Sequence, residues 1–397
     1  MTGTSPLPVY LDHAATTPVD AAVTAAMVEC LESPFGFANP SSSHIAGRQS
    51  AAAIEHARVQ VAGLLNAEPH EIVFTSGATE SNNLAILGAA RQRASRGRHL
   101  VTMTTEHKAV TECFEALERE GFEVTWLNPE MSGLLDPDRL EAVLRDDTQL
   151  LSVMHVNNET GIVQDIGSIG AICRARGILY HCDAAQSAGK LEIDLKVLPV
   201  DLMSLTAHKF HGPQGIGALY VADRPGSHPA PLIYGGPQER RIRPGTQAVH
   251  QIIGFGVAAE LAAARREADT EKFRVLRERL WQGIGDLPDL WRNGAEEHTF
   301  PGILNVSAGG VDGESLMLGL EPLCVASGAA CNSQSGESSY VLRAMGRSDA
   351  LAQSAIRFSL GRGTRNGEID RAIERYRWAV QHLRALAPAR AATANRA

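Results

Sequence analysis

Short apolar runs alternate with helical patterns between about residue 70 and residue 222. Seven of these runs have the composition of strands, and amphipathic stretches separate most of them: "EIVFT", "HLVTMT", "FEVTWL", "LLSVMHV", "ILYHC", "DLMSLTA" and "GALYVA". Parallel strands need crossover connections and are buried on both faces, so this alternation predicts a mostly parallel, seven-stranded sheet covered by helices. We therefore expect an α/β fold whose large domain is built on this sheet.

A second, smaller α/β pattern follows a long helical stretch that runs from Thr246 to about Gly283. It has a helix near Ser315 to Leu320, a strand in "IRFSL" and a final helix from Glu368 to about Leu386. The chain has 397 residues, whereas a single hydrophobic core stops growing when a chain reaches roughly 250 to 300 residues. We expect two domains, a large one over 15–262 and a small one formed by 1–14 and 263–397.

Composition argues against several classes of protein. The hydrophobic fraction of 44% and charged fraction of 21% are typical of a globular chain, and the net charge of −8 provides no general field for binding nucleic acid. The N-terminus lacks a basic segment followed by an apolar one, and no window approaches 18 apolar residues, so we expect a cytoplasmic protein without a membrane partner. Six cysteines without a CxxC pair predict neither a disulfide framework nor a metal site.

The stretch "EIVFTSGATESNN" predicts a strand, a turn of small residues and the start of a helix. Backbone N–H groups at Gly77 and Ala78, with the Thr79 hydroxyl, would favour an anion such as a phosphate at this helix N-terminus. An ordinary helix cap formed by Thr79 explains the same letters, and the turn alone leaves both interpretations open.

Two charged residues follow other buried strands. Asp183, in "ILYHCDAAQSAG", lies at the carboxyl edge where open α/β sheets bind ligands, although it could instead cap a helix. Lys209, in "TAHKFHGPQGIG", ends a buried strand, where an ammonium must reach water or have a partner. A phosphate cup, a carboxylate and a lysine on one sheet are together the set that pyridoxal phosphate needs. Cys182 we interpret as a packed core thiol.

The sequence resembles the cysteine desulfurases of the NifS/IscS type, in fold-type I of the pyridoxal phosphate enzymes. The matching strings run in order from the N-terminus to the last strand: "YLDHAATTP", "NPSSSH", "EIVFTSGATESNN", "TEHKAV", "VNNETG", "DAAQSAGK", "AHKFHGPQGIGALY", "RPGT", "SGAACNS" and "AIRFSLGR". Many strings in order are far more specific than any one of them.

The resemblance implies a role for each cofactor-binding residue. Lys209 forms the Schiff base with pyridoxal 5'-phosphate, Asp183 pairs with the pyridinium nitrogen, and Gln186 hydrogen-bonds the phenolic oxygen. His107 stacks on the ring and moves protons, and on its own it could be a surface histidine. The phosphate is held by residues from two subunits of a homodimer: Ala78, Thr79, Thr206 and His208, with Thr246 from the neighbouring subunit.

The resemblance also assigns the substrate carboxylate to Asn158, which lines the cofactor as well, and to Arg357. Asn158 could instead be a turn residue in "NNETG". Arg357 lies inside the apolar "AIRFSL", and an arginine in a strand needs an anion. Its planar guanidinium matches the two oxygens of a carboxylate.

Cys331 lies in "VASGAACNSQSGESSY", a stretch of Ser, Gly and Ala that we predict to be a mobile loop over about 327–338 in the small domain. A thiol on such a loop is placed to react, whereas Cys324 in the apolar "LCVA" is placed to pack. The alternative is a stray surface cysteine. The resemblance makes Cys331 the nucleophile that takes sulfur from L-cysteine as a persulfide while L-alanine leaves.

The sulfur acceptor is not identified by the sequence. Relatives that serve iron–sulfur scaffolds carry Leu-Glu-Pro after the cysteine loop, where this chain reads "GES" over 336–338, and the tail "APARAATANRA" does not resemble their docking tail. The acceptor protein could serve iron–sulfur assembly, tRNA thiolation or DNA phosphorothioation of the DndA type, without direct nucleic-acid binding. The alternatives are a selenocysteine lyase, another fold-type I enzyme, and a scaffold without catalysis.

Overall fold

A computed structural model describes residues 8–327 and 338–386. The chain divides into two compact units. The large unit comprises Ala14–Asn158 and Ile162–Thr270, and the small unit comprises the described parts of Met1–His13, Glu159–Gly161 and Glu271–Ala397. The long helix α7 (Val249–Ile284) contributes residues to both, and the division within it falls later than residue 262, where the sequence placed the domain boundary.

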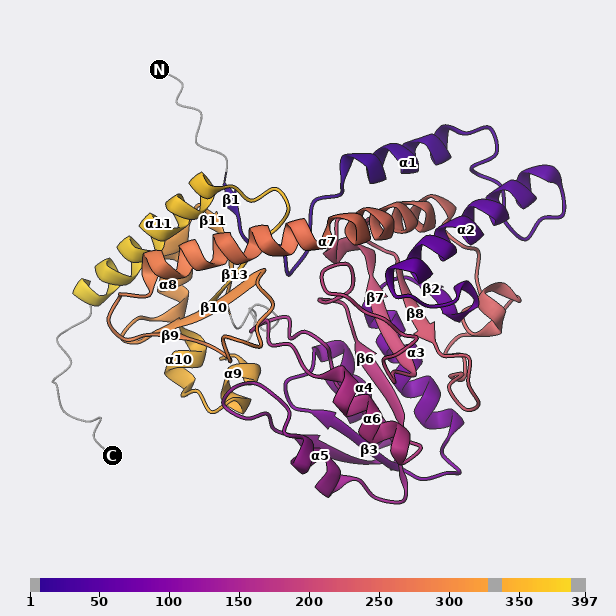
Figure 1. Cartoon of the computed structure of the whole chain (residues 1–397), viewed down its shortest axis with the longest axis horizontal. Coiled ribbons are helices and arrows are strands. Elements are labelled where there is room, and N and C mark those ends of the chain that lie inside the picture. Colours follow the sequence, from indigo (N-terminus) through magenta and orange to yellow (C-terminus); the bar gives the residue numbers. More distant parts are fainter. Residues whose placement is uncertain (1–7, 328–337, 387–397) are drawn as a thin grey trace. The chain divides into compact units, whose positions relative to one another are not determined.

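The large unit contains the predicted seven-stranded sheet, in the order β2-β8-β7-β6-β5-β3-β4 (Figure 1). Only β8 runs antiparallel to its neighbours, so the mostly parallel sheet is confirmed. Each predicted run forms one strand: β2 (Ile72–Thr75), β3 (His99–Met103), β4 (Glu123–Leu127), β5 (Thr148–Ser152), β6 (Leu179–Asp183), β7 (Leu202–Thr206) and β8 (Gly217–Val221).

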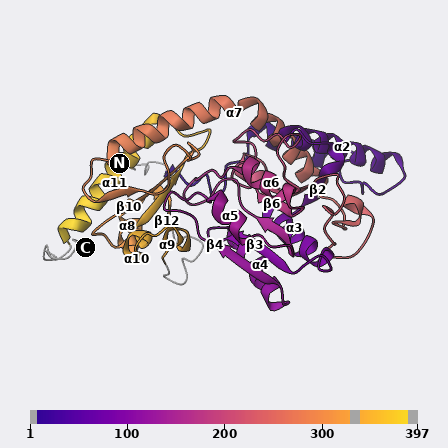
Figure 2. The ribbon, with the colours of Figure 1, turned by 60° about the horizontal axis from the view of Figure 1, so that its bottom comes forward.

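Helices pack on both faces of this sheet (Figures 1 and 2). Alternate residues of a strand point to opposite faces, so Val73 belongs to one core while Ile72 and Phe74 belong to the other. One core includes side chains of α3 (Ala78–Gln92) and α4 (Lys108–Arg119). The other core includes side chains of α1 (Ala21–Glu32), α2 (Ile45–Leu64), α5 (Pro137–Val143), α6 (Ile166–Ala175) and α7.

The small unit is built on a four-stranded antiparallel sheet in the order β12-β13-β10-β9 and a parallel pair, β1 with β11. Its strands are β1 (Val9–Tyr10), β9 (Leu290–Arg292), β10 (Ile303–Ala308), β11 (Leu323–Cys324), β12 (Ala326–Ser327) and β13 (Ala355–Ser359). Its helices are the end of α7 with α8 (Gly313–Leu320), α9 (Tyr340–Ala344), α10 (Asp349–Gln353) and α11 (Asn366–Leu386). The helix and strand predicted near Ser315 and in "IRFSL" are both present.

Within 8–327 and 338–386, no helix is long and apolar enough to cross a lipid bilayer. In the same part of the chain, no cluster of three or more His, Cys, Asp or Glu side chains is placed to hold a metal ion.

Candidate active site

Asp183 is the last residue of β6 and is 6% exposed at the carboxyl end of the strand. Its Oδ2 accepts a hydrogen bond of 2.7 Å from Asn82 Nδ2 on α3, and its Oδ1 accepts one of 2.9 Å from the backbone N–H of Ala185. The residues after Asp183 form turns rather than a helix, so the capping alternative reduces to this single local bond. A buried carboxylate fixed by neutral donors is suited to pairing with a cation.

Lys209 ends the short 3₁₀ helix η2 (Ala207–Lys209), which directly follows β7. Its Nζ donates to the backbone oxygens of Ala14 and Ala15, at 2.6 and 2.7 Å. Gln186 Nε2 donates to the same Ala14 oxygen at 2.7 Å, which brings Gln186 and Lys209 to one point of the large unit. Strands β6 and β7 are adjacent and parallel, with Asp183 paired to Ser204, so their two functional residues leave the sheet at the same edge.

The predicted phosphate cup is a tight turn between β2 and α3. Gly77 precedes the helix with φ 153° and ψ 177°, a conformation open essentially to glycine alone, and no side chain caps the helix. Thr79 therefore does not act as the cap, and the first N–H groups of α3 remain available for an anion. A Cβ built on Gly77 would lie 3.8 Å from Thr206 Oγ1, which places that hydroxyl beside the turn.

His107 is the N-cap of α4, where its Nδ1 accepts a hydrogen bond of 3.1 Å from the backbone N–H of Ala109. Burial lowers the pKa of His107; the charge of Asp183 partly opposes this and that of Lys209 adds to it. Both the cap and the lowered pKa favour a neutral ring with its proton on Nε2. A second proton can enter only at Nδ1, after the bond to Ala109 opens.

A cavity of about 390 Å³ between α3 and α4 includes both Thr79 and His107 in its lining. The other lining residues are Asn83, Leu87, Lys108, Ala109, Glu112, Cys113 and Ala116. Its volume is in the range of small-molecule sites. The structure thus brings His107 and the first turn of α3 to one open space.

His208 is half-buried, and its Nδ1 lies 3.1 Å from Thr16 Oγ1. Burial, followed by the charges of Lys209 and Lys190, lowers the pKa of His208 to about 4. A neutral imidazole at this position can exchange a hydrogen bond with a phosphate but brings no charge to it.

The remaining predicted residues come from other parts of the chain. Asn158 is a half-buried turn residue after β5, and Thr246 is exposed before α7. Arg357 belongs to the small unit, where it is 8% exposed on β13 and its Nη2 donates to Asp12 Oδ1 at 2.6 Å. Asp12 is thus the anion that an arginine in a strand requires. Cys331 and all but the ends of the loop predicted over 327–338 lie outside the described residues, as does the tail "APARAATANRA".

The five described cysteines are free thiols, and four of them are buried. Burial raises the pKa of Cys113 and that of Cys173 to about 12, raises that of Cys30, and raises that of Cys182 well above its usual range. Cys182 is fully buried, which confirms its interpretation as a core thiol. Buried thiols of this kind are poor nucleophiles because the thiolate is the reactive form.

Pyridoxal phosphate is compatible with the residues of the large unit. The buried Asp183 carboxylate suits a protonated ring nitrogen, Lys209 lies at the adjacent strand end, and the α3 N-terminus with Thr206 suits a phosphate. These groups lie at or just after the carboxyl ends of β2, β6 and β7, at the edge of the sheet where open α/β folds bind ligands.

Three contacts of this site were missed by sequence reasoning. Asn82 anchors Asp183, the buried Glu106 accepts the Met154 N–H at 3.0 Å through Oε1, and the carbonyl of Ala14 receives both Lys209 and Gln186. Burial raises the pKa of Glu106 well above its usual range. These contacts could not be read from the sequence because they join residues far apart in the chain. The one available signal was that Glu106 directly precedes His107 in the matching string "TEHKAV".

Comparisons with known proteins extend this geometry. The chain matches the class-V aminotransferase family over residues 9–372. The cysteine desulfurase IscS of Proteus mirabilis (strain HI4320) is 54% identical over 383 residues, which are 96% of this chain and 95% of that protein. A NifS-like protein of known structure superposes with a TM-score of 0.88 at 34% identity, covering 95% of this chain and 100% of that one. DndA from Streptomyces lividans gives a TM-score of 0.75 at 39% identity, with 88% and 99% covered.

Proposed function

Because the chain belongs to the class-V aminotransferase family, among its cysteine desulfurases of the IscS type, we propose that it takes sulfur from L-cysteine through Lys209, Asp183, His107 and Cys331. The observation that supports this most strongly is the 54% identity over 96% of the chain, which accompanies a lysine and a buried carboxylate at one sheet edge. The products are L-alanine and a persulfide on Cys331.

In this proposal, Asp183 and Lys209 of the large unit each have one task in the reaction. Pyridoxal phosphate, when bound, supplies an electron-withdrawing ring that weakens the Cα–H bond of the amino acid. Asp183, fixed in position by its bonds from Asn82 and Ala185, would hold the ring nitrogen protonated. Lys209, released from the oxygens of Ala14 and Ala15, accepts the proton from Cα.

The sulfur step is a displacement at the substrate's sulfur atom. The Cys331 thiolate attacks that atom, an S–S bond forms, the C–S bond breaks, and the carbon fragment takes up a proton to leave as alanine. One thiol and one cysteine therefore give one persulfide and one alanine, with no external oxidant. His107 is placed to take a proton at Nδ1 once its bond to the Ala109 N–H opens.

The substrate carboxylate is the ligand we propose for Arg357 and Asn158. Arg357 already has a carboxylate partner, because Asp12 bonds one of its terminal nitrogens. That bond holds the guanidinium in place, and a planar guanidinium matches the two oxygens of a carboxylate.

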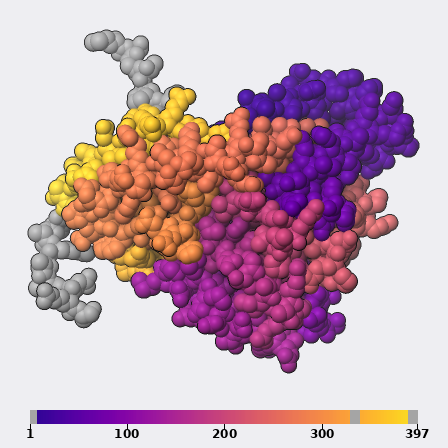
Figure 3. Space-filling view, in the orientation of Figure 1, coloured from indigo at the N-terminus to yellow at the C-terminus, as the bar shows by residue number. Residues whose placement is uncertain are grey.

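We infer a homodimer formed through the N-terminal part of the large unit. Large apolar side chains gather at the surface from α1 to the start of α2: Val28 at 43% exposed, Leu31 at 61%, Phe35 at 38%, Phe37 at 84% and Ile45 at 60%. The same segment forms an outer face in the space-filling view (Figure 3, indigo). Exposed apolar patches of this kind mark interaction surfaces on soluble proteins, so we place the dimer interface here. We propose that the enzyme is cytoplasmic.

We propose that the sulfur acceptor is a protein of the kind that IscS-type desulfurases supply. Identity to that type is 54%, against 39% to DndA, which favours iron–sulfur assembly or tRNA thiolation over DNA phosphorothioation. The "GES" at 336–338 and the unusual tail predict a partner surface different from that of the housekeeping enzymes.

The function is tested by incubating the purified protein with L-cysteine and measuring alanine and protein-bound sulfur together. Equal amounts of both support the proposal, and Lys209→Ala should form neither. Alanine formation by a Cys331→Ala variant at the native rate, with the sulfur released as elemental sulfur, or as sulfide once a thiol reductant is added, would instead support the selenocysteine-lyase type of reaction.

A further inference from the structure

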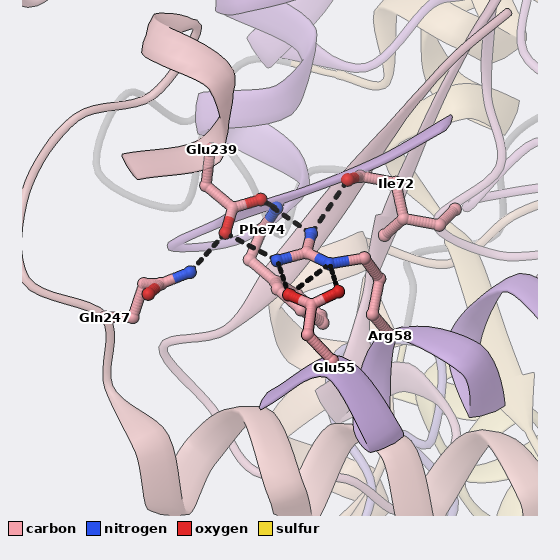
Figure 4. Close-up of polar contacts among 6 residues, drawn as sticks. All are labelled: Glu55, Arg58, Ile72, Phe74, Glu239 and Gln247. Atoms are coloured by element: carbon pink, nitrogen blue, oxygen red, sulfur yellow. Dashed lines mark hydrogen bonds and ion pairs between the residues drawn. The ribbon is translucent and has the colours of Figure 1, made fainter. Parts of the chain in front are cut away.

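A buried ionic cluster joins α2, β2 and the 3₁₀ turn η3 (Gln238–Arg241) in the large unit (Figure 4). Glu239 and Arg58 form a two-bond pair: Arg58 Nη1 donates to Oε2 at 2.8 Å and Nη2 donates to Oε1 at 2.9 Å. The side chains are 1% and 9% exposed. Burial disfavours the guanidinium, yet the bond to Glu239 and its charge raise the pKa of Arg58 on balance. This pair has no role in the reaction proposed above.

The cluster provides hydrogen-bond partners for backbone groups at the edge of the sheet. Strand β2 is an edge strand, and alternate residues of an edge strand direct their backbone groups away from the sheet. The Ile72 carbonyl accepts from Arg58 Nη1 at 2.9 Å, and the Phe74 N–H donates to Glu239 Oε2 at 2.9 Å. Arg58 also lies over the Phe74 ring, 4.7 Å from its centroid. Glu239 is therefore fixed to the sheet by backbone and side-chain donors together.

The backbone that presents Glu239 is in an unfavourable conformation. Glu239, Arg240 and Arg241 have φ values of 43°, 55° and 65°, in the left-handed region that non-glycine residues rarely adopt. Three such residues in succession persist only where surrounding contacts hold them. The four hydrogen bonds that Glu239 accepts, two from Arg58 and one each from Phe74 and Gln247, are the contacts that do so.

The same contacts enclose the segment that bears Thr246. Gln247 donates to Glu239 Oε1, so the two ends of 239–247 are joined through one carboxylate. Inside that span, Arg243 Nε donates to Glu80 Oε1 at 2.8 Å, and Glu80 Oε2 accepts the Ser76 N–H at 2.6 Å in the turn that forms the phosphate cup. Gln238 Oε1 accepts the Gly245 N–H at 3.2 Å. The exposed Thr246 thus lies on a loop whose conformation is fixed on both sides.

We propose that Glu239, held by Arg58, is a positioning residue that presents Thr246 in the geometry needed to bind the cofactor phosphate of a neighbouring subunit. The inference rests on the proposed function, because it takes Thr246 as a phosphate ligand across a homodimer. Preformed loop geometry improves affinity because no ordering is needed when the ligand binds.

The test is a double-mutant cycle on cofactor affinity. Glu239→Gln keeps the shape of the side chain but removes its charge and places an NH₂ group among N–H donors. We expect the dissociation constant of pyridoxal phosphate, titrated into cofactor-free protein by visible absorbance, to rise about 10- to 100-fold. Thr246→Val should raise this dissociation constant by a similar factor. The double variant should bind the cofactor no more weakly than the weaker-binding single variant, because both substitutions act through one contact.

Hydrogen exchange supplies a readout that needs no bound cofactor. In cofactor-free Glu239→Gln protein, exchange in 238–247 should increase while exchange in β6 and β7 stays native. The matched control is Glu120→Gln, which breaks an exposed pair with Arg91 and should alter neither measurement. Gln247→Met, a milder change that removes one donor to Glu239, should give a smaller rise of the dissociation constant if Glu239→Gln does not fold.

Two results overturn the inference. One is native loop exchange and native cofactor affinity in whichever of Glu239→Gln and Gln247→Met folds. The other is a double variant whose two losses add fully, which is the behaviour of a general structural role. Failure of the proposed function is a separate result, seen when native protein binds the cofactor but forms no alanine from cysteine.

Discussion

Gly217→Ala is the substitution whose effect on the phosphate cup can be worked out most directly. Gly217 begins β8 and lies against both β7 and the turn before α3. A Cβ at this position would lie 2.4 Å from the Leu205 oxygen and 2.6 Å from the Gly77 Cα, where ordinary contact begins near 3.4 Å. All of these are backbone atoms, so the strand or the Gly77 turn must move by up to about 1 Å.

Such a displacement lowers stability and disturbs the cup together. We expect Gly217→Ala to reduce the free energy of unfolding by about 2 kcal/mol, typical of inserting a carbon into a packed region. Because the N–H groups of the Gly77 turn shift, the dissociation constant of pyridoxal phosphate should rise about tenfold or more. Denaturant unfolding and absorbance titration measure the two effects.

Gly63→Ala is the matched control. Gly63 is the second-last residue of α2, and a Cβ there meets no atom within 4 Å other than the nearby backbone of its own helix. The same chemical change should therefore stabilise the protein by about 0.5 to 1 kcal/mol and leave cofactor affinity unchanged. The reasoning is refuted if Gly217→Ala unfolds like the native protein and binds the cofactor equally well.

Three further predictions concern His181, Arg357 and Asn82. Burial lowers the pKa of His181 from 6.5 to about 4, so its contribution is present above pH 6.5 and lost as the pH falls toward 4. Denaturant unfolding should show native protein losing about 2.5 kcal/mol more than His181→Gln between about pH 7.5 and 4.5. Arg357→Lys keeps the charge but loses the planar fork, so steady-state kinetics should show KM for cysteine rising about tenfold. Asn82→Leu removes the bond to Asp183, and absorbance titration should show about tenfold weaker cofactor binding.

Each of these three has an outcome that contradicts it. Equal pH dependence in native protein and His181→Gln would mean that the ring is not desolvated when folded. An unchanged KM in Arg357→Lys would remove the substrate carboxylate from that residue. Native cofactor affinity in Asn82→Leu would mean that Asp183 needs no anchor.

The sheet could be predicted from the sequence because its signal is local. Each strand is a short apolar run, and parallel strands that are buried on both faces leave such runs uninterrupted. The positions of Asp183 and Lys209 followed for the same reason, since Asp183 ends one strand and Lys209 ends the short helix that follows another. Their approach at one edge then depends only on β6 and β7 being neighbours.

The partners of these residues could not be predicted, because they are distant in sequence. Asn82 lies on a helix far before Asp183, Asp12 pairs with Arg357 near the other end of the chain, and Glu239 reaches back to Arg58. A single sequence gives no measure of distance between such residues. The conformation of residues 239–241 was equally hidden, because none of them is a glycine that would have indicated a positive φ.

The central claim is that Cys331 receives sulfur that leaves L-cysteine at a site built around Lys209. The most direct measurement is mass spectrometry of the protein after a brief exposure to L-cysteine, with peptides mapped under non-reducing conditions. The account predicts one added sulfur atom on the peptide that contains Cys331, in proportion to the alanine formed and absent in Lys209→Ala. Added sulfur on the peptide of Cys324 or another cysteine instead, or alanine released with no sulfur on the protein, would contradict it.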